Sequence, residues 1–106
     1  MTETQYHELV DKLLLSIEEA LDDFAVDIDT ESAEGILTLT FENGSKMVLN
    51  KQEPLLQLWV ATKFNGHHFN YEDGLWIDQR GAGEFWAFLD EAMTVQAEQA
   101  VVLGIK

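Results

Sequence analysis

The sequence predicts an α+β fold, a two-layer α/β sandwich in which two helices pack on one face of an antiparallel sheet of about six strands. Apolar residues recur with helical spacing near both ends of the chain, and short runs of period two lie between them. Turn sequences such as Asn43-Gly44 and Asp73-Gly74 separate these runs. Since each strand offers one apolar face and each helix one apolar stripe, both helices must cover the same face of the sheet. The 106 residues fit a single domain, residues 1–106.

An amphipathic helix is expected from Thr2 to about Phe24. At about 100° per residue its apolar side chains form one continuous stripe, made of Tyr6, Leu9, Val10, Leu13, Leu14, Ile17, Ala20, Leu21 and Phe24. Thr2 or Thr4 is the expected N-cap, and Gln5 lies three residues after Thr2, as in a capping box.

Three strands are expected next. Val26, Ile28 and Thr30 alternate with acidic residues, which predicts a strand near the edge of the sheet with one solvated face. Residues 36–41 and 46–50 flank a turn in which Asn-Gly supplies the positive φ angles of a tight hairpin. This hairpin places the second and third strands side by side.

The remaining strands and the second helix follow Pro54, which ends the third strand because proline donates no ladder hydrogen bond. Alternation resumes over residues 56–61, and residues 67–71 and 75–78 form a closing hairpin. Helical spacing returns from about Gly83. The second helix therefore completes the layer that covers the sheet.

The composition excludes several classes of function. Six basic against 20 acidic residues give a net charge of −14, which disfavours binding to nucleic acid or to an anionic membrane. The chain has no cysteine, so a metal would be held by carboxylate, imidazole or carbonyl groups. No apolar run approaches the roughly 20 residues needed to span a bilayer, and the N-terminus lacks a signal-peptide pattern. We expect a soluble, cytoplasmic protein.

The acidic residues are concentrated at one end of the chain. Eleven of the 20 lie in the first 34 positions, where Lys12 is the only base. On a helical projection the candidate metal ligands of the first helix lie away from the apolar stripe; they are Glu3, His7, Asp11, Glu18, Glu19, Asp22 and Asp23. Like charges four residues apart repel, and the helix dipole disfavours acids near the C-terminus, so the sequence accepts a local electrostatic cost.

A hard cation that prefers oxygen ligands would relieve this repulsion, and His7 adds a nitrogen that suits iron. Because a convex helix face cannot enclose an ion, we expect weak, solvent-accessible binding at several positions. From composition and periodicity alone, an acidic face that is merely solvated is the commoner explanation.

Two aromatic features lie on the predicted sheet. Alternation places Trp59 and Gln57 on the face that no helix covers, where they suggest a partner contact. The alternative is that Trp59 lies flat on neighbouring strands and shields their backbone. His67 and His68 are adjacent on one strand, so they point to opposite faces and cannot chelate one ion together.

Signatures of a classical active site are missing. Ser16, Ser32 and Ser45 have no nearby pattern of histidine and acid, and Gly81-Ala82-Gly83 lacks the context of a phosphate-binding loop. No enclosed set of carboxylates and histidines is evident, as a di-iron bundle would supply. We therefore do not expect an enzyme.

Several segments together carry a specific family likeness over nearly the whole chain. They are Ile17-Glu18-Glu19, Leu21-Asp22-Asp23, residues 37–46 with the Asn-Gly turn, Asn50-Lys51-Gln52-Glu53-Pro54, Gln57-Leu58-Trp59, His68-Phe69, Trp76 and Arg80. On these residues the chain resembles bacterial frataxin, the CyaY family.

The resemblance implies a frataxin-like fold and iron binding, as Fe²⁺ or Fe³⁺, on the acidic ridge of the first helix. It also implies binding to the cysteine desulfurase and the scaffold complex of iron–sulfur cluster assembly, with regulation of sulfur delivery. In that picture Glu18, Glu19, Asp22 and Asp23 match the family's metal and partner positions, with Glu3 and His7 as accessory ligands; Gln57 and Trp59 match its exposed sheet surface. A monomer is expected, which iron could drive to oligomerise.

The sequence also allows two other functions: an iron-oxidising enzyme of the ferroxidase type, and an acidic interaction module that does not bind iron. The chain also departs from the family after Asp23, where residues 24–26 replace a longer acidic loop. Asp27, Asp29 and Glu31 are expected to compensate for the lost ligands. Little chain remains after the second helix to cover the groove between the helices.

Overall fold

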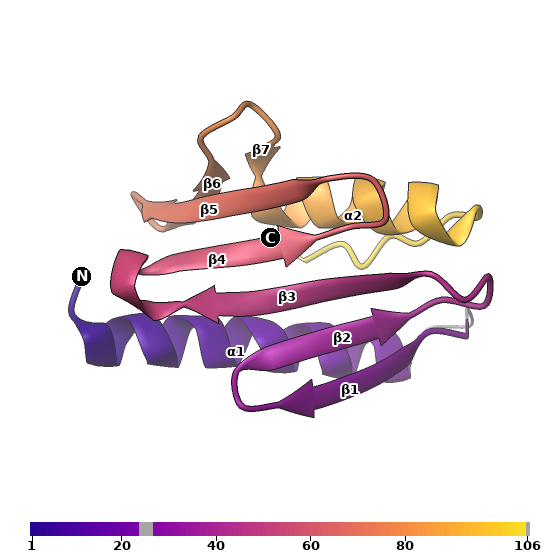
Figure 1. The fold of residues 1–106 in the computed structure, drawn as a ribbon, viewed down its shortest axis with the longest axis horizontal. Coiled ribbons are helices and arrows are strands. Elements are labelled where there is room, and N and C mark those ends of the chain that lie inside the picture. The colour runs from indigo at the N-terminus through magenta and orange to yellow at the C-terminus, as the bar shows by residue number, and fades with distance from the viewer. Residues whose placement is uncertain (24–26, 106) are drawn as a thin grey trace.

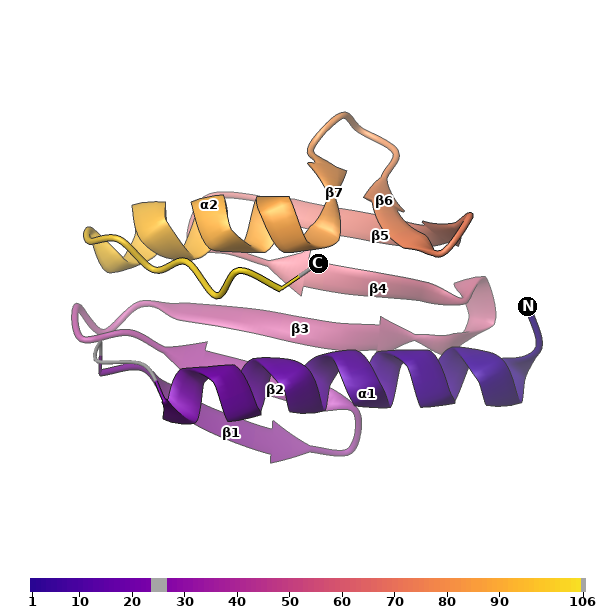
Figure 2. The ribbon, with the colours of Figure 1, turned by 180° about the vertical axis from the view of Figure 1, so that it is seen from behind.

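Two helices lie on one face of a seven-stranded antiparallel sheet in the computed structural model, which describes residues 1–23 and 27–105 (Figure 1). The strands follow chain order across the sheet. The view from behind shows α1 over one half of the sheet and α2 over the other (Figure 2). The elements are α1 (Glu3–Asp22), β1 (Asp29–Ala33), β2 (Ile36–Thr40), β3 (Lys46–Gln52), the 3₁₀ turn η1 (Glu53–Leu55), β4 (Gln57–Ala61), β5 (Gly66–Glu72), β6 (Leu75–Asp78), β7 (Gly83–Glu84) and α2 (Phe85–Ala97).

The capping box expected at the start of α1 is confirmed. The Gln5 amide donates to Thr2 Oγ1 at 3.1 Å, and the Thr2 amide donates to Gln5 Oε1 at 2.9 Å. The helix ends at Asp22 with Asp23 as C-cap, so it is shorter than the predicted range, and Phe24 lies outside the described residues.

The first strand was predicted too early in the chain. β1 begins at Asp29, while the predicted start at Val26 lies outside the described residues. Its register is set by the turn to β2, where Glu34 and Gly35 have φ of 50° and 79° and Ala33 faces Ile36. A local alternation pattern does not contain this constraint, because the turn and the partner strand decide which residues pair.

The start of α2 and the start of β4 also differ from the prediction. Gly83 and Glu84 form the short strand β7 instead of helix, which gives seven strands in place of about six. The Glu84 carboxylate accepts hydrogen bonds from the Trp86 and Ala87 amides and so caps α2. Leu56 adopts a left-handed conformation with φ 51° after η1, and β4 therefore begins at Gln57.

The core lies between the helices and the inward face of the sheet. Alternate residues of the central strands, such as Leu37, Met47 and Phe69, are fully buried, and so are Tyr6 and Phe85 of the helices. Burial of this apolar surface is the main source of stability. Among the described residues, neither helix is long and apolar enough to cross a membrane.

The chain after α2 covers part of the groove between the helices, more than was expected (Figure 2). Val101 is fully buried and exchanges hydrogen bonds with the Thr94 hydroxyl at 3.0 and 3.1 Å. The Leu103 amide donates to Asp90 Oδ1 at 2.9 Å. A cavity of about 300 Å³ lined by Leu13 and Ile105 remains open.

Candidate metal site and acidic ridge

The structure separates the predicted ligands of α1 into two regions. Glu3, His7 and Asp11 lie in its N-terminal half, beside the end of β3. Glu18 and the acids that follow it lie at the other end of the helix, and His7 is about 16 Å from Glu18 along the axis at the usual rise per residue. One helix therefore carries two acidic regions that cannot share an ion.

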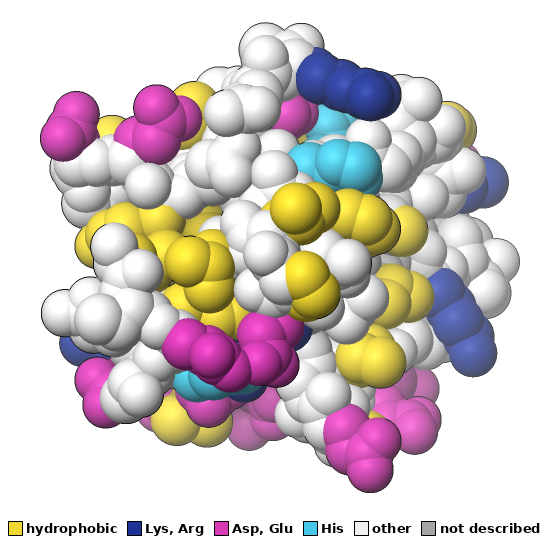
Figure 3. Space-filling model, turned by 60° about the vertical axis from the view of Figure 1, so that its left-hand side comes forward, with side chains coloured by type: hydrophobic (Ala, Val, Ile, Leu, Met, Phe, Trp, Pro, Cys, Tyr) yellow, Lys and Arg dark blue, Asp and Glu magenta, His cyan; other side chains and the backbone are white. Residues whose placement is uncertain are grey.

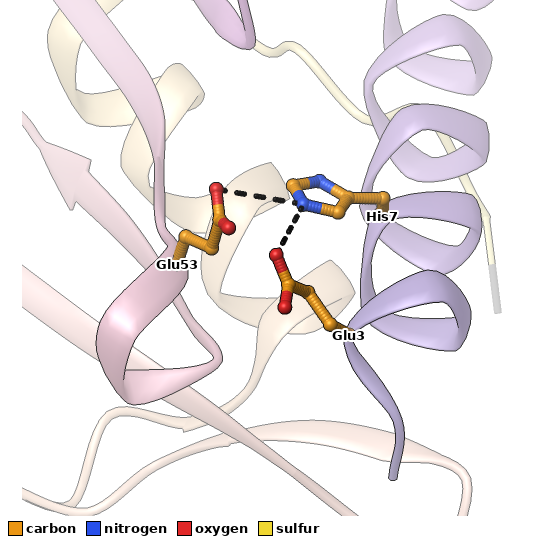
Figure 4. A group of neighbouring side chains, drawn as sticks. All are labelled: Glu3, His7 and Glu53. Carbon is orange, nitrogen blue, oxygen red and sulfur yellow. Dashed lines mark ion pairs between the residues drawn. The ribbon is translucent and has the colours of Figure 1, made fainter.

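Glu3, His7 and Glu53 form the first of these regions, which we call the N-terminal cluster. One ligand atom from each of the three lies within 4.8 Å of the others, and the side chains point toward one another from α1 and η1 (Figure 4). His7 Nε2 lies 3.5 Å from Glu53 Oε2 and 4.0 Å from Glu3 Oε1. Among residues 1–23 and 27–105 no other set of three such residues is this close.

The backbone explains why these three side chains meet. Glu3 and His7 are i and i+4 on one helix face. Glu53 is the first residue of η1, directly after β3, with Pro54 in the first turn. The Tyr6 hydroxyl donates to the Gln57 carbonyl at 2.6 Å and so joins α1 to the chain just beyond η1. Glu53 could not be predicted from the sequence, because nothing local indicates which residue of a distant turn faces the helix.

Lys51 was missed as well. Its ammonium donates to Asp11 Oδ1 at 2.6 Å and to His7 Nδ1 at 3.0 Å. Asp11 is thus paired with a cation of the protein itself, and its donor atoms are not part of the three-residue group. Period-two alternation carried on from Met47 and Leu49 would have placed Lys51 on the inward face.

The electrostatics of the N-terminal cluster reflect the close approach of two carboxyl groups. A hydrogen bond and Coulomb repulsion from Glu53 raise the pKa of Glu3 above its ordinary value, burial adds to this shift, and His7 opposes it. A cation placed between the two carboxyl groups would remove this repulsion.

Replacing Glu53 by Gln is expected to return the pKa of Glu3 toward its ordinary value. With the raised pKa the folded chain holds this proton more tightly than the unfolded chain. The free energy of unfolding therefore falls as pH rises from the ordinary to the raised pKa. In Glu53→Gln this pH dependence should be absent. Carbon-13 NMR titration of the Glu3 carboxyl measures the change, with Glu72→Gln as the control. An unchanged Glu3 titration in Glu53→Gln would contradict the assigned contact.

The second region is the acidic ridge at the C-terminal end of α1, formed by Glu18, Glu19, Asp22 and Asp23. Glu18 is half-buried and the other three are exposed. Within the part of the chain that the structure describes, none of the four takes part in an ion pair. The ridge is therefore an open anionic surface. Asp27, Asp29 and Glu31, expected to add ligands, are also exposed.

The open face of the sheet carries Gln57 and Trp59 as predicted. The Trp59 ring stacks on His68 of the neighbouring strand, with centroids 4.1 Å apart and planes 11° from parallel. Its Nε1 donates to Gln57 Oε1 at 2.8 Å, and Gln57 Nε2 donates to Asn70 Oδ1 at 3.1 Å. Trp59 thus lies flat on a neighbouring strand, which agrees with the second of the two interpretations of this residue. It is fixed in place and still half-exposed.

His67 and His68 point to opposite faces, which confirms the prediction for them. His67 packs against Phe88 with ring centroids 4.5 Å apart, and its Nδ1 lies 3.1 Å from Asp78 Oδ2. Burial acts to raise the pKa of Asp78, but hydrogen bonds from the Arg80 amide and from His67 outweigh it, so the net pKa is lowered. This pair joins β5 to β6 beneath α2 and belongs to the core.

The end of the molecule near η1 combines acidic and apolar surface. Acidic side chains lie directly beside a histidine on this face, with apolar side chains across its middle (Figure 3). Leu55 of η1 is 56% exposed. Two carboxylates and one imidazole are a donor set that suits Fe²⁺ or another divalent first-row metal. Solvent reaches the cluster, since Glu3 and Glu53 are exposed.

Comparisons with known proteins identify the family of the chain and agree with its fold. A family model described as a frataxin-like domain matches residues 1–99. An iron-sulfur cluster assembly protein CyaY from Pseudoalteromonas atlantica is 63% identical over 101 residues, which cover 95% of this chain and 94% of that protein. The solved structure of frataxin from Psychromonas ingrahamii is similar with a TM-score of 0.90 at 39% identity, over 99% of this chain and 100% of that one. Trimeric frataxin from the yeast Saccharomyces cerevisiae, in a ferrous complex, is similar with a TM-score of 0.72 at 27% identity, over 93% and 88%.

Proposed function

Because the chain belongs to the frataxin-like family, we propose that it is a non-enzymatic, iron-binding adaptor that regulates iron–sulfur cluster assembly in the bacterial cytoplasm. Its partners in this proposal are the cysteine desulfurase and the scaffold complex. Support comes from a relative named as an iron-sulfur cluster assembly protein at 63% identity.

The N-terminal cluster is the main observation in support of iron binding. Its two carboxyl groups and one imidazole offer ligand atoms within 4.8 Å of one another, at the surface. The donor set is oxygen-rich with one nitrogen, as iron accepts. The acidic ridge offers further, weaker positions, since its four carboxylates are spread along a convex surface. Relatives give independent support, because a yeast frataxin with a TM-score of 0.72 was crystallised in a ferrous complex.

The partner half of the proposal uses the acidic ridge and the open sheet face. The ridge attracts a basic surface over a distance of about one Debye length, which raises the rate of association. Trp59 and Gln57 then supply a rigid, half-exposed aromatic and polar contact, because the stack on His68 holds the indole in place. We propose a monomer that associates further when iron is bound; a yeast relative is trimeric in its ferrous complex.

Iron titration tests the metal half. Fe²⁺ added without oxygen to ¹⁵N-labelled protein is expected to perturb the amides around Glu3, His7 and Glu53 together with those of the ridge. Glu53→Gln should weaken binding at the N-terminal cluster by about tenfold, because one charged ligand is lost. The ridge signals should respond as before.

The matched control is Glu72→Gln, which removes the same charge from an exposed position at the end of β5. Unchanged amide spectra at millimolar Fe²⁺ would refute the metal half of the proposal. Equal weakening by both variants would show that only net charge matters.

A further inference from the structure

Lys51 occupies a position that the proposed metal site does not explain. It lies on β3 two residues after Leu49, on the face that packs against α1, and its side chain is only 17% exposed. A lysine normally extends into water. This one directs its ammonium into an acidic region, where it contacts both Asp11 and His7.

The path of the side chain is also fixed. The Lys51 amide donates to the Gly35 carbonyl at 3.3 Å. The aliphatic stem passes over Gly35 in the turn between β1 and β2, where a Cβ atom would lie 3.1 Å from Lys51 Cδ. The absence of a side chain at Gly35 therefore leaves room for the stem, and the ammonium reaches Asp11 and His7 of the helix.

The hydrogen bond to His7 has a chemical consequence. An ammonium group only donates, so Nδ1 of His7 must be the acceptor. In the neutral imidazole the proton then lies on Nε2, the nitrogen that faces Glu3 and Glu53. A metal ion bound at Nε2 requires the lone pair there and a proton on Nδ1, and two donors would then face each other between His7 and Lys51.

From these contacts we propose that Lys51 is a built-in competing cation, which lowers the affinity of the N-terminal cluster for a divalent metal ion and must release His7 when the ion binds. The inference rests on the proposed iron site and adds a regulatory element to it. The ammonium already supplies positive charge to the acidic region, and it holds the imidazole in the form that does not accept a metal. A weak, reversible site suits an adaptor that takes up iron and gives it away.

Fe²⁺ titration of the wild type and three variants tests the competition, read from the amide signals of the N-terminal cluster. Lys51→Met is expected to bind Fe²⁺ about tenfold more tightly than wild type, because the positive charge that contacts Nδ1 of His7 is removed. Lys51→Gln keeps a donor without the charge and should also bind more tightly. Lys12→Met, an exposed residue of α1, makes the same change in net charge and should leave the affinity within about twofold.

A second readout needs no iron. The ring ¹⁵N shifts of His7 should report an acceptor at Nδ1 and a proton at Nε2 in the wild type, and a changed distribution in Lys51→Met. If Lys51→Met folds poorly, the glutamine variant carries the test, with the amide spectrum as the check of folding.

The outcomes distinguish the two proposals. Wild type and both Lys51 variants binding Fe²⁺ with equal affinity would overturn the competition and leave the iron site intact. An equal gain in Lys12→Met would also overturn it, since net charge would then suffice. No binding by any chain would refute the iron site and the competition together.

Discussion

Replacing Glu18, Glu19, Asp22 and Asp23 together by their amides is expected to weaken binding to the cysteine desulfurase by about 100-fold at low ionic strength. Each exposed charge pair across such a surface contributes roughly 0.2–1 kcal/mol, and four of them give a loss of this size. The amides keep the shape and polarity of the side chains and remove their negative charge. Affinity can be measured by calorimetry at two salt concentrations.

The dependence of this affinity on salt concentration tests the prediction more specifically than the affinity alone. Wild-type affinity should fall as salt rises, because the Debye length shortens from about 30 Å at 0.01 M to about 8 Å at 0.15 M. The affinity of the quadruple variant should fall much less over the same range of salt concentration. A control with the same net charge replaces Glu8, Glu72, Asp73 and Glu91, four exposed acids outside the ridge. Equal losses in both variants would contradict a localised interface.

The largest expected effect on stability comes from Phe69→Ala in the interior strand β5. Phe69 is fully buried, with its ring 5.4 Å from Phe85 in an edge-to-face contact and 5.1 Å from Phe88. Truncation removes these contacts and leaves a cavity between the sheet and α2, at a cost of about 3–5 kcal/mol. Urea denaturation measures the change in the free energy of unfolding.

Phe64→Ala is the matched control for this substitution. Phe64 is 61% exposed, in the turn before β5, so the same change should cost about 0.5 kcal/mol or less. A loss at Phe69 no larger than that at Phe64 would show that the core is not organised around this ring.

Local patterns were enough to predict much of the fold. The stripe of α1 and its capping box depend on residues within one or two helical turns, and the Asn43-Gly44 hairpin depends on four. These elements can therefore be predicted from short stretches of sequence. The position of β1 cannot, because its register depends on the turn at Glu34 and Gly35 and on pairing with β2.

The candidate site was predicted in part for a similar reason. Helical periodicity groups Glu3, His7 and Asp11 on one face, and the acidic ridge follows from the same projection. The residues that distinguish the N-terminal cluster come from elsewhere: Lys51 lies 44 positions after His7, and Glu53 lies two further on. Their meeting depends on how η1 follows β3, which is a tertiary property.

The acidic face of α1 is not one continuous site. A helical projection ignores distance along the helix axis, so Glu3 and Asp22 fall into one sector although about 28 Å separates them. The structure instead offers one compact group with a nitrogen ligand and one extended anionic surface. This is why iron binding and partner binding can be tested with different variants.

Sulfur release by the cysteine desulfurase, measured from cysteine with and without this protein across a series of Fe²⁺ concentrations, tests the proposed function most directly. We predict that the wild-type chain changes the rate in an iron-dependent manner and that the variant of Glu18, Glu19, Asp22 and Asp23 does not. An unchanged rate with the wild-type chain at every iron concentration, or an equal effect of the variant, would contradict the proposal.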